Sequence, residues 1–252
     1  MSDDEGAAPV PDRYRGVWVR TLLTTPTSRD ETSFVRWLQT SRWHADLRIP
    51  LAARPDELAL QQGFCGVTTV DPSEGAEVCR WHRRLDFQPP GPQPDAGHIV
   101  FEGTERLIET GVHADYLEVW QRLPGSTGRF AVLEAISGEL PSMLMVSGEF
   151  AMRVRPRSEA WPGDATTADT LRDLVQRHPG AAAALLDFEI SFGRLAQGRL
   201  HIEQSSLPAL EGTHEPCHIE RIDGDAAVVH GPARAADSWR VLEWDTEGLR
   251  LA

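Results

Sequence analysis

Hydrophobic and polar residues alternate with a period of two along most of the chain. Each alternating segment is short, is rich in Val, Trp, Phe, Thr or Leu, and is bounded by Gly, Pro, Asp or Ser, as β-strands are. Turn signals recur about every ten to fourteen residues, a rhythm typical of an antiparallel barrel or sandwich. The segments predicted as strands are residues 16–25, 32–40, 43–50, 64–70, 77–87, 98–102, 106–111, 115–123, 129–136, 142–147, 149–155, 186–195, 199–204, 218–222, 226–230 and 238–244.

Helical spacing is confined to two stretches. Residues 54–62 predict a brief helical turn. Residues 166–178 predict one short helix, because Leu171, Leu174 and Val175 recur at helical spacing and Pro179-Gly180 follows. A parallel α/β fold would alternate its strands with long helical patterns, so the chain is predicted to be all-β.

The predicted organisation has three parts. Residues 1–13, rich in Asp, Pro and Ala, are expected to be a disordered N-terminal segment. Residues 14–140 form the first β-barrel, and residues 141–252 form a second, smaller one that contains the helix at 166–178. The boundary is placed near residues 138–148.

The charge of the chain excludes several classes of function. Of 252 residues, 38 are acidic and 25 are basic, which gives a net charge of −13, and such a field repels nucleic acid. All the basic residues are arginine. Without lysine, the chain cannot form a Schiff base, bind pyridoxal phosphate through lysine or carry a phosphate-loop lysine.

The remaining composition predicts a cytoplasmic protein. Three cysteines, Cys65, Cys79 and Cys217, are too few and too scattered for a disulfide framework. No apolar run approaches the roughly 20 residues that span a bilayer, and the acidic N-terminus lacks the apolar core of a signal peptide. We therefore expect no membrane association.

The strand at residues 43–50 separates its residues cleanly by face. One face is apolar (Trp43, Ala45, Leu47 and Ile49) and the other is polar (His44, Asp46 and Arg48). The polar face either meets solvent or lines the barrel interior, where Asp46 and Arg48 would orient a ligand. His44, which lies among Trp and Arg residues, is a candidate general base, or an ordinary strand histidine.

The strand at residues 115–123 has a comparable mixed face. Tyr116, Glu118, Trp120 and Arg122 share it, a combination typical of pocket walls and also of an exposed face with an ion pair. The same pairing of an aromatic with a polar residue occurs at Trp18 with Arg20 and at Trp37 with Gln39. The candidate ligand-binding residues are therefore Trp18, Arg20, Trp37, Gln39, Tyr116 and Trp120, and the candidate catalytic residues are Asp46, Arg48, Glu118 and His44.

Motifs of known catalysts and metal sites are missing from the sequence. It has no Gly-x-Gly-x-x-Gly, Gly-x-Ser-x-Gly, His-Glu-x-x-His or Cys-x-x-Cys. His214, Cys217 and His218 are the nearest to a zinc set, but the adjacent Cys217 and His218 point to opposite faces of a strand. We expect no metal and no cofactor.

Several segments resemble a known family. Tyr116-Leu-Glu-Val-Trp-Gln-Arg-Leu, Phe192-Gly-Arg-Leu-Ala-Gln-Gly-Arg-Leu with Leu210-Glu-Gly downstream, and Trp239-Arg-Val-Leu-Glu-Trp are similar to parts of the Hri family, fungal proteins of unassigned activity. Trp37-Leu-Gln-Thr through Asp46-Leu-Arg-Ile-Pro looks like bacterial relatives. The resemblance implies two lipocalin-like (calycin) barrels in tandem, and it implies no catalytic residues.

Two functions fit these observations. The first is a binding protein whose larger barrel holds a small, largely apolar ligand. The alternative is a cofactor-free enzyme of bacterial secondary metabolism, a cyclase, hydratase or lyase, in which Arg20 or Arg48 holds an oxyanion and Asp46, Glu118 or His44 moves protons. The sequence leaves open whether two copies form a homodimer.

Overall fold

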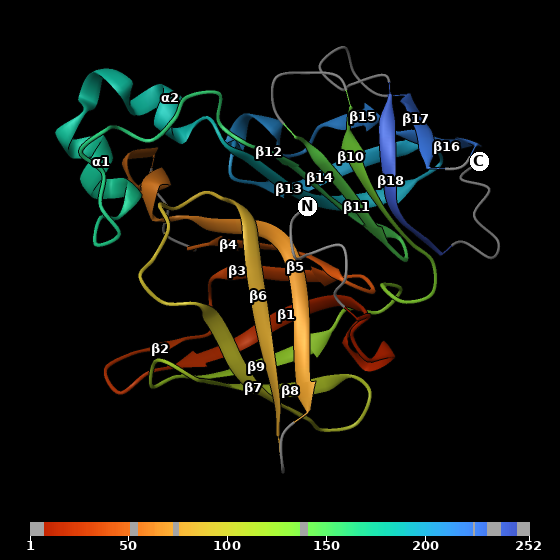
Figure 1. Ribbon diagram of the computed structural model, residues 1–252, viewed down its shortest axis with the longest axis horizontal. Helices are drawn as coiled ribbons and strands as arrows, with labels where there is room; N and C mark the ends of the chain where they lie inside the picture. Colours follow the sequence, from red (N-terminus) through yellow and green to blue (C-terminus); the bar gives the residue numbers. More distant parts are fainter. Residues whose placement is uncertain are drawn as a thin grey trace.

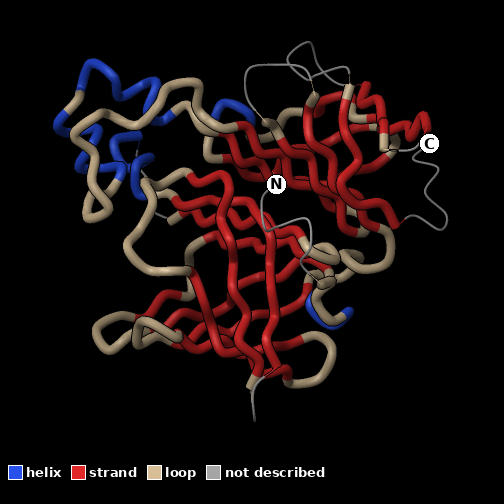
Figure 2. Tube along the Cα trace, in the orientation of Figure 1, coloured by secondary structure: helices blue, strands red, loops and turns tan. Residues whose placement is uncertain are grey.

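Antiparallel strands are the main regular structure in a computed structural model, which describes residues 8–50, 55–72, 76–136, 141–223, 225–230 and 238–245. These residues form two nine-stranded sheets, stacked one above the other in Figure 1. Figure 2 shows that strands dominate both sheets and that the α-helices gather at one side. The predicted all-β class, with two barrels in tandem, is confirmed.

The first sheet is a closed barrel. Its strands follow in the spatial order β2-β1-β3-β4-β5-β6-β7-β8-β9, and β9 pairs back onto β1, where Trp18 lies opposite Arg122. The strands are β1 (Gly16–Thr24), β2 (Arg29–Asp30), β3 (Phe34–Gln39), β4 (Trp43–Ile49), β5 (Gln62–Pro72), β6 (Glu77–Asp86), β7 (Asp95–Phe101), β8 (Arg106–Gly111) and β9 (Leu117–Arg122).

The second sheet curls almost into a barrel. Its order is β15-β14-β13-β12-β11-β10-β18-β17-β16, so β15 and β16 are its end strands. The strands are β10 (Phe130–Ala135), β11 (Met143–Ser147), β12 (Phe150–Arg155), β13 (Glu189–Ala196), β14 (Arg199–Ser205), β15 (His214–Pro216), β16 (His218–Asp223), β17 (Ala226–His230) and β18 (Trp239–Asp245).

Two boundaries differ from the sequence prediction. β10 pairs with β11 and β18, so it belongs to the second barrel, and the division falls at residues 123–129 and not near residue 140. The expected disordered segment, residues 1–13, lies partly outside the described residues. Within them, Val10 is buried and its amide bonds to the Ser41 carbonyl at 2.7 Å, because this apolar side chain packs on the barrel interior.

The helical segments are short. They are α1 (Leu171–Arg177), α2 (Ala182–Leu186) and the 3-10 turns η2 (Asp12–Tyr14), η3 (Pro55–Leu60), η4 (Pro179–Ala181) and η5 (Pro208–Leu210). The predicted helix at 166–178 begins only at Leu171, because Thr170 and Asp173 form a capping box there. In the described part of the chain, no helix is long and apolar enough to cross a membrane.

Buried apolar side chains form three clusters. One fills much of the first barrel and contains Trp18, Trp37 and Trp120. A second fills the second barrel with small and aliphatic residues. The third lies between the barrels and draws on both, so that Leu47 of β4 and Ile190 of β13 share it. We call these the first interior core, the second interior core and the inter-barrel core.

Polar contacts also join the two barrels. The guanidinium of Arg157 donates to the carbonyl of Phe87 at 2.6 Å and to that of Leu185 at 3.0 Å. The Ser41 hydroxyl donates to Glu243 at 2.7 Å. The Arg157–Phe87 and Ser41–Glu243 contacts each join a residue in or near a strand of one barrel to a residue of the other. They therefore hold the two barrels together.

Candidate functional site

β4 is buried on both of its faces. Its apolar residues Trp43, Ala45 and Leu47 pack in the inter-barrel core, outside the first barrel. Its polar residues therefore point into the first barrel, and His44 and Asp46 are almost fully buried there. Of the two alternatives that the sequence left open, the interior placement of Asp46 and Arg48 is the one observed.

A cavity of about 360 Å³ lies in the first barrel. Its lining combines a few apolar side chains with several charged ones, contributed by strands on opposite sides of the barrel. The lining residues are Arg20, Leu23, Thr25, Ser33, Arg48, Pro50, Leu60, Gln62, Asp95, Glu109, Tyr116 and Glu118. Four of the predicted site residues are in this set: Arg20, Arg48, Tyr116 and Glu118.

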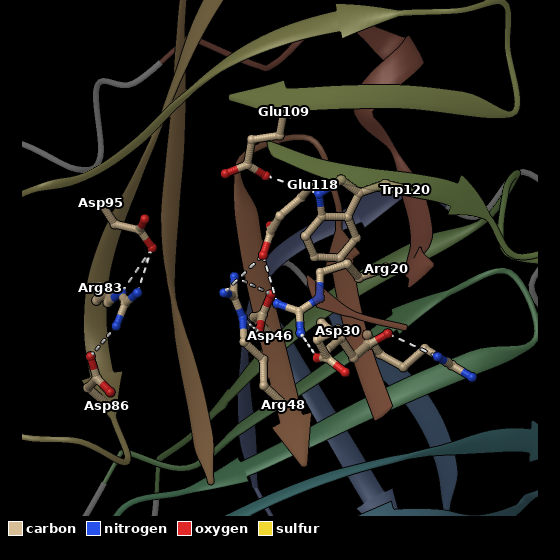
Figure 3. A network of polar contacts seen from close by, with 12 residues as sticks. Arg20, Asp30, Asp46, Arg48, Arg83, Asp86, Asp95, Glu109, Glu118 and Trp120 are labelled. Atoms are coloured by element: carbon tan, nitrogen blue, oxygen red, sulfur yellow. Dashed lines mark hydrogen bonds and ion pairs between the residues drawn. The ribbon is translucent and has the colours of Figure 1, made fainter. Parts of the chain in front are cut away.

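The charged residues form a continuous network (Figure 3). Arg20 donates to Glu118 at 2.7 Å and to Asp30 at 2.9 Å. Arg48 donates to Asp46 at 2.7 Å, and its Nη1 lies 3.8 Å from Glu118. The network therefore runs Asp30–Arg20–Glu118–Arg48–Asp46, and Glu118 is held between two guanidinium groups.

The neighbours of Arg48 stabilise its positive charge. Burial alone disfavours the charged form, but the attraction of Asp46 and Glu118 outweighs it and raises the pKa of Arg48 above its usual value. The guanidinium is therefore a fixed positive charge in the cavity wall.

Glu109 lies directly opposite Glu118, because the two residues are register partners on β8 and β9. Glu109 accepts a hydrogen bond from the Tyr116 hydroxyl at 2.7 Å and one from the Trp120 indole at 3.1 Å. Burial raises the pKa of Glu109 well above its ordinary value, and the adjacent Glu118 carboxylate raises it further. Two facing carboxyl groups thus have opposite environments, one ion-paired and one that favours the proton.

Glu118 has one oxygen that is not used. Its Oε1 receives Arg20, whereas its buried Oε2 has no hydrogen-bond partner in the described structure. Only 3% of the residue is exposed. A buried carboxylate oxygen is normally hydrogen-bonded, so this atom is an unsatisfied acceptor in a residue that lines the cavity.

The other predicted residues pack behind this wall. Trp18, Trp37 and Trp120 are buried in the first interior core, where the Trp37 ring lies 5.8 Å from that of Trp120. Trp37 also donates to Gln39 at 3.2 Å. None of these four side chains is among the lining residues of the cavity. They shape the barrel, and Trp120 acts on the cavity through Glu109.

His44 is also away from the cavity lining. Its Nδ1 lies 3.0 Å from the Thr68 hydroxyl, and its ring contacts Phe64. Complete burial lowers the pKa of His44 well below its usual value, so the imidazole is neutral. The Arg83 guanidinium lies over the Phe64 ring, with its central carbon 3.6 Å from the ring centroid.

A second, larger cavity adjoins the first. It has a volume of about 720 Å³, lies along the end of β6 and the following segment 88–94, and shares Asp95 and Tyr116 with the first cavity. Arg83 bridges the gap between β6 and β7, where it donates to Asp95 at 2.6 Å and to Asp86 at 2.9 Å. The Arg83–Asp95 ion pair lies where the two cavities meet, because Asp95 lines both of them.

Sequence reasoning missed Glu109, Asp95 and Gln62. Glu109 shares a strand face with Leu107 and Gly111, and period two alone would have placed it inward once Leu107 was taken as core. Asp95 falls in the segment that the sequence assigned to a loop, so its face could not be inferred. Among the described residues, no group of three or more His, Cys, Asp and Glu could hold a metal ion.

Comparison with known proteins adds to the fold. The crystal structure of the uncharacterized protein YLR301w from Saccharomyces cerevisiae is similar to this chain, with a TM-score of 0.62 over 91% of this chain and 98% of that one. The two share a fold. Their sequences are 13% identical, so the similarity carries no functional residues. No family model and no curated protein matches the chain.

Proposed function

We propose that the chain binds a small molecule in the cavity of its first barrel. The observation that carries this proposal is the cavity of about 360 Å³ in the first barrel, whose lining includes the charged side chains of Arg20, Arg48 and Glu118. The Arg20 and Glu118 side chains are only 7% and 3% exposed. Burying ion pairs costs several kcal/mol per ion before their attraction is counted. Charged groups held in this way around an open space, next to apolar side chains, are suited to orienting a ligand.

The lining sets the character of the ligand. Leu23, Pro50 and Leu60 offer an apolar surface, in keeping with the expected apolar ligand, but the charged groups require a polar group on it as well. The proposed ligand is therefore amphipathic, and small enough for a cavity of about 360 Å³.

Mass spectrometry of molecules released from the purified, denatured protein tests the binding. A compound that co-purifies with the wild type should be lost from Leu23→Trp, in which the larger side chain fills the cavity. Val100→Trp is the matched control, because Val100 is 46% exposed on β7. Absence of any such compound, or equal retention by Leu23→Trp, would overturn the proposal.

An enzyme is the second candidate, favoured by the facing carboxyls. Glu109 favours the proton and can donate it, while Glu118 lies opposite it in the same cavity and is paired with Arg20 at 2.7 Å. Arg48 is placed to stabilise negative charge on a substrate. Glu118 takes the role of base that was predicted for His44, because Glu118 lines the cavity and His44 does not. A metabolite extract whose composition changes on incubation with the wild-type protein, but not with the Glu109→Gln variant, would support the enzyme.

We further propose a cytoplasmic location and distant membership in the Hri family. All three cysteines are free and buried, which favours a reducing compartment. The proposed family membership rests on the sequence segments quoted above and on the tandem barrels. Fractionation of the native host, with the protein followed by immunoblot, tests the location.

A further inference from the structure

The charges of the cavity network do not balance. The series Asp30–Arg20–Glu118–Arg48–Asp46 contains three carboxylates and two guanidinium groups. Both guanidinium groups are engaged by carboxylates of the network. Asp95 and Glu109 add two more carboxyl groups to the lining, and only Asp95 has a cation of its own, Arg83. Because Glu109 favours its protonated form and Asp95 is paired with Arg83, the excess of negative groups comes from the Asp30–Arg20–Glu118–Arg48–Asp46 series itself.

One carboxylate oxygen beside the cavity has no partner. Glu118 is a lining residue of the cavity, and its buried Oε2 has no hydrogen-bond partner in the described structure. A carboxylate oxygen only accepts hydrogen bonds, so the group that completes it must be a donor. A charged donor forms a hydrogen bond roughly twice as strong as a neutral one, and its charge would offset the surplus of carboxylates.

We propose that the cavity binds an organic ammonium ion, with the ammonium group beside the Glu118 carboxylate and the apolar part against Leu23, Pro50 and Leu60. This inference rests on the proposed binding function and specifies its ligand class. An anion of the same shape would meet Arg20 and Arg48 already engaged by carboxylates, and would face Glu109, Glu118 and Asp95.

Binding of the ammonium ion should be coupled to release of a proton from Glu109. The groups that face it are Glu118, Tyr116, Trp120, Asp95 and Arg48. In the ligand-free protein its raised pKa keeps the proton on the carboxyl at mildly acidic pH. A cation beside Glu118 favours the ionised form of Glu109, so binding releases a proton and the affinity rises with pH over that range.

Three probes of one shape test the charge selectivity: benzylammonium, benzyl alcohol and benzoate, each titrated calorimetrically into the full chain. Benzylammonium should bind most tightly, and repeating the titration in buffers of different ionisation enthalpy should show proton release. Glu118→Gln should weaken benzylammonium by about tenfold or more while leaving benzyl alcohol within about twofold. The control Glu105→Gln removes an acidic side chain that is 67% exposed and should change neither.

The outcomes separate the two proposals. If benzyl alcohol or benzoate binds the wild type as tightly as benzylammonium, and Leu23→Trp abolishes that binding, the ammonium inference fails while the binding function stands. If none of the three binds at millimolar concentration, the ammonium inference also fails. The binding function then falls only if no compound co-purifies with the protein. Because Glu118→Gln breaks the pair with Arg20, its thermal unfolding is measured first, and the order of the three probes on the wild type decides the question without it.

Discussion

Arg48 is the residue on which the stability of the cavity wall depends most directly. Removing it leaves Asp46, 3% exposed, as a buried carboxylate without its partner. Deleting one member of a buried pair typically costs roughly 3–5 kcal/mol, and the partial exposure of Arg48 places the expected loss near the lower end. Arg48→Ala should therefore lose about 3 kcal/mol in urea unfolding.

Arg29→Ala is the matched control. Arg29 pairs with Glu31 at 2.8 Å, and both side chains are more than half exposed, so its loss should cost less than about 1 kcal/mol. Equal unfolding midpoints for the two variants would mean that the interior network contributes no more than a surface ion pair.

Glu109 should make the fold less stable as pH rises. Its folded-state pKa lies above the ordinary value of 4.5, so from about pH 4.5 upward the folded state retains a proton that the unfolded chain has lost. Stability then falls with increasing pH until the folded-state pKa is passed. Glu109→Gln removes this titration, and Tyr116 can reverse its hydroxyl to accept from the amide. The variant should gain stability relative to wild type as pH increases. Unfolding free energies measured at several pH values that show parallel curves would contradict this.

At the scale of the strands, β4 shows where pattern recognition succeeds and where it stops. Alternation correctly divided Trp43, Ala45 and Leu47 from His44, Asp46 and Arg48. It could not decide which set faces inward, because a second barrel covers the outside of the strand and both sets are buried. The same limit hid the partner of Glu118: Glu109 comes opposite it only through the register of β8 and β9, which no local pattern encodes.

An outward-facing residue of β4 should behave as core. Leu47 is fully buried between the barrels, so Leu47→Ala should cost about 2–5 kcal/mol. Val100 also faces outward, on β7, but it is 46% exposed, and Val100→Ala should change stability by less than about 0.5 kcal/mol. Chemical denaturation of both variants makes the comparison. A similar small effect at the two positions would show that the barrels do not rely on each other.

For the whole molecule, the sequence predicted two barrels correctly but divided them too late along the chain. Residues 129–136 follow the first nine strands without a change in composition, so nothing local assigns them to the second sheet. Their assignment comes from pairing with β18, more than a hundred residues later. Long-range pairing of that kind is visible only in the fold.

The three cysteines report on the three cores separately. Cys79 lies in the first interior core, Cys217 in the second and Cys65 between the barrels. Burial raises the pKa of Cys65 to about 12 and that of Cys217 to about 11, so each thiol is unreactive until its core opens. We expect single-cysteine variants to become reactive to a maleimide at the same urea concentration, because both barrels contribute to the inter-barrel core and its loss should unfold them together.

Labelling of Cys217 at a lower urea concentration than Cys79 would instead show that the second barrel opens alone. The Arg157 contacts to Phe87 and Leu185 provide a further check, since Arg157→Met leaves those carbonyls unpaired and should allow Cys65 to react earlier.

Because β4 is enclosed on both faces, it should tolerate few substitutions. Its first five positions, from Trp43 to Leu47, are all buried: three of them lie in the inter-barrel core, and His44 and Asp46 lie inside the first barrel. In a saturation mutagenesis screen scored for soluble expression, these positions should form an unbroken block of intolerance, whereas tolerated positions should recur along β7, where exposed and buried residues are mixed. A gain of ligand specificity by substitution of Asp46 or Arg48 would therefore require compensating changes among their ion-pair partners inside the first barrel, such as Glu118.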